Sequence, residues 1–145
     1  MKLIGIIDSM NFSSFDLEYL FVDDNVVILD IMVELLKLTG IPEKNILTAE
    51  NGKLCLQKIK DNPDIKFIFL DINMPIMNGF ETAEELRKDN YSGTIIAITG
   101  MVGYDYINEA FRCGINYLCN KPITMKSLKK IIDIEIENEN ENNKK

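Results

Sequence analysis

The chain has 145 residues, 46% hydrophobic and 27% charged, which is typical of one folded domain with a buried core. Its formal net charge of -7 argues against nucleic acid or an anionic membrane as a partner, because a negative surface repels phosphate groups. The sequence contains no histidine, which excludes Ser-His, Cys-His and zinc-histidine chemistry within the chain.

Neither a signal peptide nor a membrane span is indicated. The apolar stretch 3–7 is too short for a signal-peptide core, and no apolar run approaches the roughly 20 residues of a membrane span. The chain has three cysteines, Cys55, Cys113 and Cys119. Their odd number does not suggest a set of disulfides and their spacing is not that of a metal site, which is typical of proteins in a reducing compartment. We therefore expect a cytoplasmic protein that contacts no membrane.

From residue 19 onward, apolar runs typical of buried strands alternate with stretches of helical periodicity. The predicted strands are 19–22, 45–49, 65–70, 94–98 and 116–119, and the predicted helices are 26–39, 53–60, 81–88, 104–113 and 124–136. This alternation predicts an α/β fold, a five-stranded parallel sheet with helices on both faces.

The predicted domain organisation has three parts. Residues 1–16 form an N-terminal extension, and residues 17–137 form the folded domain. Residues 138–145 are a polar tail without an apolar side chain, which we expect to be disordered.

Polar side chains stand where the predicted strands end. Asp23 and Asp24 follow the first strand, Asp71 the third, Thr99 the fourth, and Lys121 comes just after the fifth. Parallel strands bring these residues to one edge of the sheet, where ligands bind in open α/β folds. Three clustered carboxylates repel one another unless a cation lies among them, and oxygen ligands suit Mg²⁺. A hydroxyl and an ammonium beside the metal could bind a phosphoryl group.

Four segments carry a family resemblance: FVDDN at 21–25, DINMPIMNG at 71–79, IIAITG at 95–100 and NKPI at 120–123. From about residue 18 to 136 the chain resembles the receiver domains of two-component response regulators, the CheY-like superfamily. The resemblance implies a doubly wound, flavodoxin-like (βα)5 fold with strand order 2-1-3-4-5.

The resemblance also implies a role for each acid. Asp71 would be the phosphoacceptor, attacking a phosphohistidine on a histidine kinase or a histidine phosphotransfer protein. Asp24 and Asp71 would ligate Mg²⁺ directly, together with the backbone carbonyl of Asn73. Asp23 would hold the metal through a water molecule.

The same resemblance assigns the other residues at the strand ends. Lys121 would pair with the phosphoryl oxygens, Thr99 would move toward them after phosphorylation, and the Lys121–Pro122 peptide would be cis. One position departs from the family pattern, because the aromatic residue usual three positions before the lysine is here Leu118. Tyr117 precedes it, but strand alternation points Tyr117 to the opposite face, so the readout of phosphorylation stays open.

The predicted helix over 26–39 has an unusually wide apolar surface. Its charged residues fall on one narrow stripe: Asp30, Glu34 and Lys37. The apolar surface exceeds the roughly 100° that a helix needs to pack on a sheet. The residues expected to need further cover are Leu29, Val33 and Leu38. Three explanations stay open: a docking site for a phosphohistidine partner, the folding back of residues 3–7, and a fully buried helix edge.

The sequence therefore predicts a receiver, stand-alone or part of a hybrid kinase, that accepts phosphate onto Asp71 in a Mg²⁺-dependent phosphorelay. It would signal by binding a downstream protein target, and it would promote its own phosphorylation and dephosphorylation without being an enzyme that turns over a substrate. One alternative is a pseudo-receiver, an interaction module not switched by phosphorylation. Another is a phosphatase of the haloacid-dehalogenase type, but that family has an acid two residues after the nucleophile, where this chain has Asn73.

Overall fold

The computed structural model describes residues 16–101 and 103–143, and within this part five parallel strands form one sheet. The strands are β1 (Tyr19–Val22), β2 (Ile46–Ala49), β3 (Phe67–Asp71), β4 (Thr94–Thr99) and β5 (Tyr117–Asn120). Their order in the sheet is β2-β1-β3-β4-β5, and every neighbouring pair is parallel. The predicted fold class and strand order are confirmed.

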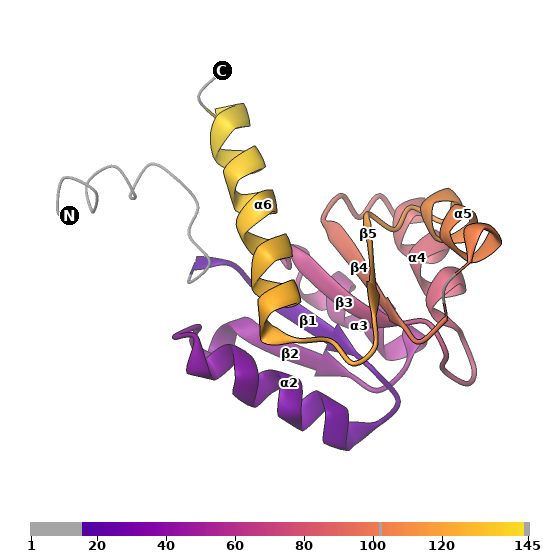
Figure 1. Cartoon of the computed structure of the whole chain (residues 1–145), viewed down its shortest axis with the longest axis horizontal. Helices are drawn as coiled ribbons and strands as arrows, with labels where there is room; N and C mark the ends of the chain where they lie inside the picture. Colours follow the sequence, from indigo (N-terminus) through magenta and orange to yellow (C-terminus); the bar gives the residue numbers. More distant parts are fainter. Residues whose placement is uncertain (1–15, 102, 144–145) are drawn as a thin grey trace, which may run out of the picture.

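An α-helix follows each strand, as the sequence predicts. The helices are α2 (Val26–Leu38), α3 (Gly52–Asp61), α4 (Gly79–Lys88), α5 (Tyr104–Arg112) and α6 (Met125–Asn143). Helices α2 and α6 cover one face of the sheet, and α3, α4 and α5 cover the other (Figure 1). A short 3-10 helix, Glu43–Asn45, replaces the predicted start of the second strand.

The core has one apolar layer on each face of the sheet. Side chains of the central strands alternate between the layers, so that Phe21 and Phe69 stack under α2 and α6 with ring centroids 4.6 Å apart. Leu20 and Leu70 belong to the layer under α3, α4 and α5. The register pairs Val22 with Leu70 across β1 and β3, and Leu70 with Ala97 across β3 and β4. The strand ends that carry the polar residues therefore lie side by side.

Helix α2 buries a narrower face than its composition suggests. Asn25 begins the helix by accepting hydrogen bonds from the amides of its first turn. Leu29 is 3% exposed and Leu38 is 83% exposed, so the prediction that both need further cover is wrong for Leu29. Val27 and Ile31 are 65% and 49% exposed, which contradicts a fully buried helix edge. The fold-back of residues 3–7 lies outside the described residues.

Helix α6 is longer than expected. A helix ending near residue 136 and a disordered tail from 138 were predicted, but α6 continues to Asn143, so disorder is the wrong prediction for residues 138–143. No proline or glycine interrupts this run, and Lys66 Nζ lies 2.6 Å from Glu139 Oε1, which ties the extra turns to the segment before β3. The last turns project beyond the sheet (Figure 1).

Two further predictions concern the ends of the chain and the membrane. The N-terminal extension lies outside the described residues except for Asp16, which is exposed. Among the described helices, none is both long and apolar enough to cross a membrane.

Candidate functional site

The site is built around Asp71, the last residue of β3. Its side chain is almost completely buried, and Lys121 Nζ lies 2.9 Å from Asp71 Oδ1. Despite that short ion pair, Oδ1 accepts no well-directed hydrogen bond from the described residues. A buried carboxylate oxygen that lacks hydrogen bonds is costly unless a ligand binds it.

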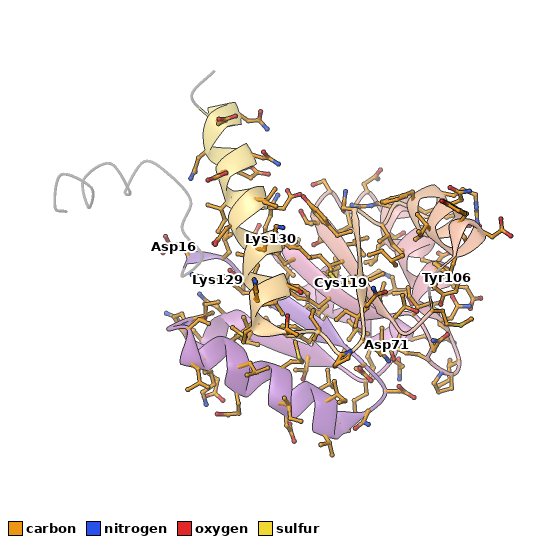
Figure 2. The ribbon with its side chains drawn as sticks, viewed as in Figure 1. Asp16, Asp71, Tyr106, Cys119, Lys129 and Lys130 are labelled. Carbon is orange, nitrogen blue, oxygen red and sulfur yellow. The ribbon has the colours of Figure 1, made fainter. Side chains whose placement is uncertain are left out.

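Asp71, labelled in Figure 2, is joined at this edge of the sheet by two further carboxylates. Asp23 and Asp24 directly follow β1, and one oxygen from each of the three acids lies within 4.8 Å of the others. Asp23 is half-buried, and its Oδ1 accepts a hydrogen bond of 2.9 Å from the Asn25 amide. Burial raises the pKa of Asp23; the Asn25 hydrogen bond opposes this, and the negative charge of Asp71 adds to it. The cluster is therefore a place of concentrated negative charge.

Lys121 brings a positive charge to the cluster from the segment after β5. Its backbone amide donates to the carbonyl oxygen of Thr99 at 2.8 Å, which fixes the segment against β4. Burial alone would lower the pKa of Lys121, but the neighbouring carboxylates, Asp71 first, outweigh it and raise that pKa. Lys121 is therefore held as the ammonium. The expected cis peptide between Lys121 and Pro122 is confirmed.

Thr99 completes the set of predicted residues but faces away from the acids. It ends β4 and is fully buried. The Met101 amide donates to Thr99 Oγ1 at 3.1 Å, and the Thr99 hydroxyl donates to Tyr106 Oη on α5 at 3.4 Å. No sequence pattern indicated Tyr106, because the contact joins a strand end to the next helix.

The loop after β3 wraps tightly behind Asp71. The Gly79 amide donates to the Ile72 carbonyl at 2.9 Å, and Asn78 and Glu81 form a capping box at the start of α4. A Cβ on Gly79 would lie 2.7 Å from the Asp71 carbonyl oxygen, so only glycine fits there. This loop places Asn73, which is exposed, beside the three acids.

A groove of about 720 Å³ runs from the acid cluster along α2. All six predicted site residues except Thr99 line it, and so do the apolar side chains of Ile28 and Ile31. Both are exposed, at 40% and 49%. The groove therefore joins a charged end at Asp71 to an apolar wall on α2.

The donor set of this cluster fits Mg²⁺. One oxygen from each of the three carboxylates lies within 4.8 Å of the others, close enough for one ion to bind them all. Asn73 lines the same groove. Mg²⁺ prefers oxygen ligands and usually binds through one or two carboxylates together with waters and phosphates. The buried Oδ1 of Asp71 is paired with Lys121 alone among the described residues, so it can still accept a bond to a cation.

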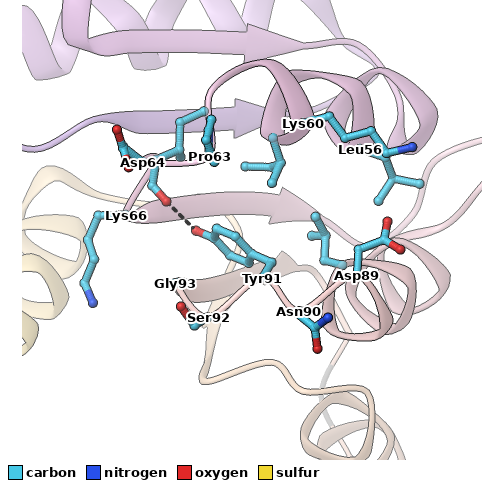
Figure 3. Close-up of a pocket in the computed structure, with 13 residues that line it drawn as sticks. Leu56, Lys60, Pro63, Asp64, Lys66, Asp89, Asn90, Tyr91, Ser92 and Gly93 are labelled. Atoms are coloured by element: carbon cyan, nitrogen blue, oxygen red, sulfur yellow. Dashed lines mark hydrogen bonds between the residues drawn. The ribbon is translucent and has the colours of Figure 1, made fainter.

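A second cavity lies at the opposite edge of the sheet, between α3 and α4 (Figure 3). It measures about 370 Å³. Tyr91 lines it, and its hydroxyl donates to the Ile65 carbonyl oxygen at 3.0 Å. No predicted site residue lies in this cavity, so it is not the candidate site.

Comparison with known proteins agrees with this geometry. Residues 19–133 match the family model described as the response regulator receiver domain. The chain is 32% identical over 120 residues to chemotaxis protein CheY1 of Helicobacter pylori, covering 81% of this chain and 95% of that protein. It is 31% identical over 118 residues to the osmosensing histidine protein kinase SLN1 of Saccharomyces cerevisiae, covering 78% of this chain but only 10% of the kinase.

A solved structure supports the fold independently. A CheY-like response regulator receiver domain protein from Methanospirillum hungatei superposes with a TM-score of 0.77 at 24% identity. The match covers 88% of this chain and 99% of that one. With the family model spanning most of the described residues, this chain belongs to the response regulator receiver domain family.

Proposed function

We propose that this chain is a cytoplasmic receiver that accepts a phosphoryl group from a phosphohistidine of a partner protein onto Asp71 and signals by binding another protein. The observation that carries the proposal is the joint placement of the three carboxylates within 4.8 Å and Lys121 at 2.9 Å from the buried Asp71. An aspartate that only ended a strand would not require the two other carboxylates or the lysine beside it.

The chemistry follows from these groups. A carboxylate oxygen of Asp71 attacks phosphorus, a P–O bond forms, and the P–N bond to the donor imidazole breaks. The electron pair of the broken bond stays on the imidazole nitrogen, which takes up a proton from solvent. The phosphorylated histidine must lie outside these 145 residues, because they contain no histidine. Lys121 stays charged and neutralises part of the negative charge of the phosphoryl oxygens.

Asp23, Asp24 and Asp71, with the carbonyl of Asn73, would hold Mg²⁺. The ion would offset the repulsion between the carboxylates and the incoming phosphoryl oxygens. Asp24 is the exposed member of the cluster, so its charge is the one most accessible to a cation from solvent.

The groove supplies a surface for the phosphohistidine partner. A donor must reach an almost completely buried carboxylate, and the groove that leads to Asp71 is walled by the exposed Ile28 and Ile31. Exposed apolar side chains beside a charged site are typical of protein docking surfaces. The relative from Saccharomyces cerevisiae is by its name a histidine kinase, and a histidine kinase or a histidine phosphotransfer protein is the partner we propose.

Incubation with Mg²⁺ and acetyl phosphate tests the proposal. The intact protein should gain the mass of one phosphoryl group, and Asp71→Asn should gain none. Asp64→Asn is the matched control, because Asp64 is exposed at the opposite edge of the sheet and its replacement should leave phosphorylation unchanged. No mass gain in the unaltered chain would indicate a pseudo-receiver, and equal gain in Asp71→Asn would place the acceptor elsewhere.

A further inference from the structure

The Thr99 hydroxyl is turned toward α5 and not toward the acid cluster. Along β4, Ile95 and Ala97 belong to the apolar layer under α3, α4 and α5, and strand alternation places Thr99 on that same side. Asp71 pairs in register with Ile98, whose side chain packs in the opposite layer. Thr99 must therefore change its side-chain direction, or shift with its loop, before its hydroxyl can reach a group on Asp71.

Tyr106 holds the hydroxyl in its present direction. Its Oη lies 3.4 Å from Thr99 Oγ1, and its ring meets the ring of Phe80 edge-on, with centroids 5.0 Å apart and planes at 67°. Phe80 belongs to the first turns of α4, so the ring of Tyr106 lies between two helices and the end of β4. Tyr104 lies two residues earlier in α5. Its side chain is 88% exposed and is not packed between helices in this way.

The hydroxyl of Thr99 has only one hydrogen to donate. Its oxygen already accepts from the Met101 amide, and its hydrogen goes to Tyr106 Oη. A phosphoryl group on Asp71 offers acceptor oxygens only, so Thr99 can bind it only by donating that same hydrogen. As long as Thr99 donates to Tyr106, it cannot donate to a phosphoryl group on Asp71.

We propose that Tyr106 is a positioning residue that restrains Thr99 before phosphorylation and is released from it afterwards. This inference rests on the proposed function, because it requires a phosphoryl group on Asp71. In β5, by contrast, Leu118 carries no hydroxyl and the Tyr117 hydroxyl donates to Glu135 on α6, so neither of these two side chains restrains Thr99. The ring of Tyr106 also contacts Phe80 on α4, so its release from Thr99 would change the packing of both α4 and α5.

The kinetic test uses Tyr106→Phe, a substitution that removes only the hydroxyl group of Tyr106. Tyr106→Phe should be phosphorylated by acetyl phosphate about two- to tenfold faster than the unaltered chain, the range that one lost hydrogen bond allows. Tyr104→Phe is the matched control and should keep the original rate. In a Thr99→Ala background the Tyr106→Phe change should have no effect, whereas in Thr99→Ser, which keeps the hydroxyl, it should have the full effect.

Each other result overturns the inference. Equal rates in Tyr106→Phe and the unaltered chain would mean that Tyr106 does not restrain Thr99. The same acceleration in the Thr99→Ala background would mean that Tyr106 acts through another group. If the unaltered chain gains no phosphoryl mass at all, the proposed function fails first and this inference fails with it.

A spectroscopic test follows Tyr106 itself. The chain has five tyrosines, and 3-fluorotyrosine labelling gives each a fluorine signal; the one absent from Tyr106→Phe belongs to Tyr106. Acetyl phosphate with Mg²⁺ should shift that signal and leave the Tyr104 signal in place. An unmoved Tyr106 signal in a sample whose mass shows phosphorylation would overturn the proposal without affecting the phosphoacceptor assignment.

Discussion

The two edges of the sheet differ in how far their polar groups are satisfied. At the carboxyl edge, three acids crowd together, and the buried Oδ1 of Asp71 has Lys121 as its one partner among the described residues. At the amino edge, Arg87 donates four hydrogen bonds, and Tyr91 donates to the Ile65 carbonyl (Figure 3). The first edge can gain stability from a ligand, whereas the stability of the second depends on hydrogen bonds that a mutation would remove.

Among the residues at the amino edge, Arg87 is the one whose replacement should destabilise the chain most. Its guanidinium donates to four acceptors: the carbonyls of Tyr91 (2.7 Å), Gly93 (2.9 Å) and Gly114 (3.0 Å) and Asn116 Oδ1 (2.8 Å). Arg87→Ala removes the donor from three part-buried carbonyl oxygens and from the exposed Asn116 side chain, and should lower the free energy of unfolding by about 2–4 kcal/mol. Urea unfolding followed by circular dichroism measures it.

The chain's only other arginine, Arg112, is the matched control. Its side chain is 60% exposed and pairs with Glu84 and Glu109, so Arg112→Ala should cost only about 0–1 kcal/mol. The folded fraction of Arg87→Ala should still be phosphorylated at Asp71, because the acid cluster lies at the other edge. Equal losses for the two arginines would contradict the contrast between the edges.

Mg²⁺ should stabilise the chain through the carboxyl edge. An ion that binds only the folded state at 100 times its dissociation constant adds about 2.7 kcal/mol, which a thermal melt detects as a higher Tm. Asp24→Asn should melt at the same temperature with and without Mg²⁺. Asp30→Asn, which removes an exposed charge on α2 outside the cluster, should keep the full shift. Indifference of the unaltered chain to Mg²⁺ would show that the acids do not form a metal site.

The sequence predicted the carboxyl edge well because topology determines it. Each of Asp23, Asp71 and Thr99 ends or follows a buried strand, and the carboxyl ends of parallel strands lie at the same edge of a sheet. Once the strands were recognised, the meeting of their ends followed without knowledge of any side-chain contact. The same argument could not give the contact of Thr99 with Tyr106, because that contact joins the end of a strand to the next helix.

The amino edge was not predicted, because its contacts join residues without a local pattern. Arg87 and Asn116 are 29 positions apart, and nothing in either neighbourhood indicates the other. Helix α2 shows a related limit: its composition is apolar almost all round, and only the spacing of Leu29, Met32 and Leu36 marks the face that is buried. Composition gave the amount of apolar surface, whereas packing selected which part of it stays exposed.

The apolar wall of the groove offers a test of docking at the carboxyl edge that leaves the chemistry intact. Ile31→Asp places a charge on the 49% exposed wall and should slow phosphotransfer from a phosphorylated histidine phosphotransfer protein about tenfold, equal to about 1.4 kcal/mol. Phosphorylation by acetyl phosphate should be unchanged, because the small donor needs no docking surface. Leu38→Asp is the control, because Leu38 is exposed on the same helix but does not line the groove. Equal slowing by both variants would point to a general effect of charge.

The smallest expected effect concerns the extra turns of α6. Lys66 Nζ and Glu139 Oε1 are 2.6 Å apart, with side chains 21% and 35% exposed. Water screens a pair of this exposure, so a double-mutant cycle with Lys66→Ala and Glu139→Gln should give a coupling of about 0.2–1 kcal/mol. Because composition alone predicted disorder here, this ion pair is the specific contact that could hold residues 138–143 in the helix. Hydrogen exchange of those amides should therefore rise in either single variant, and unchanged exchange would mean that helix propensity alone sustains α6.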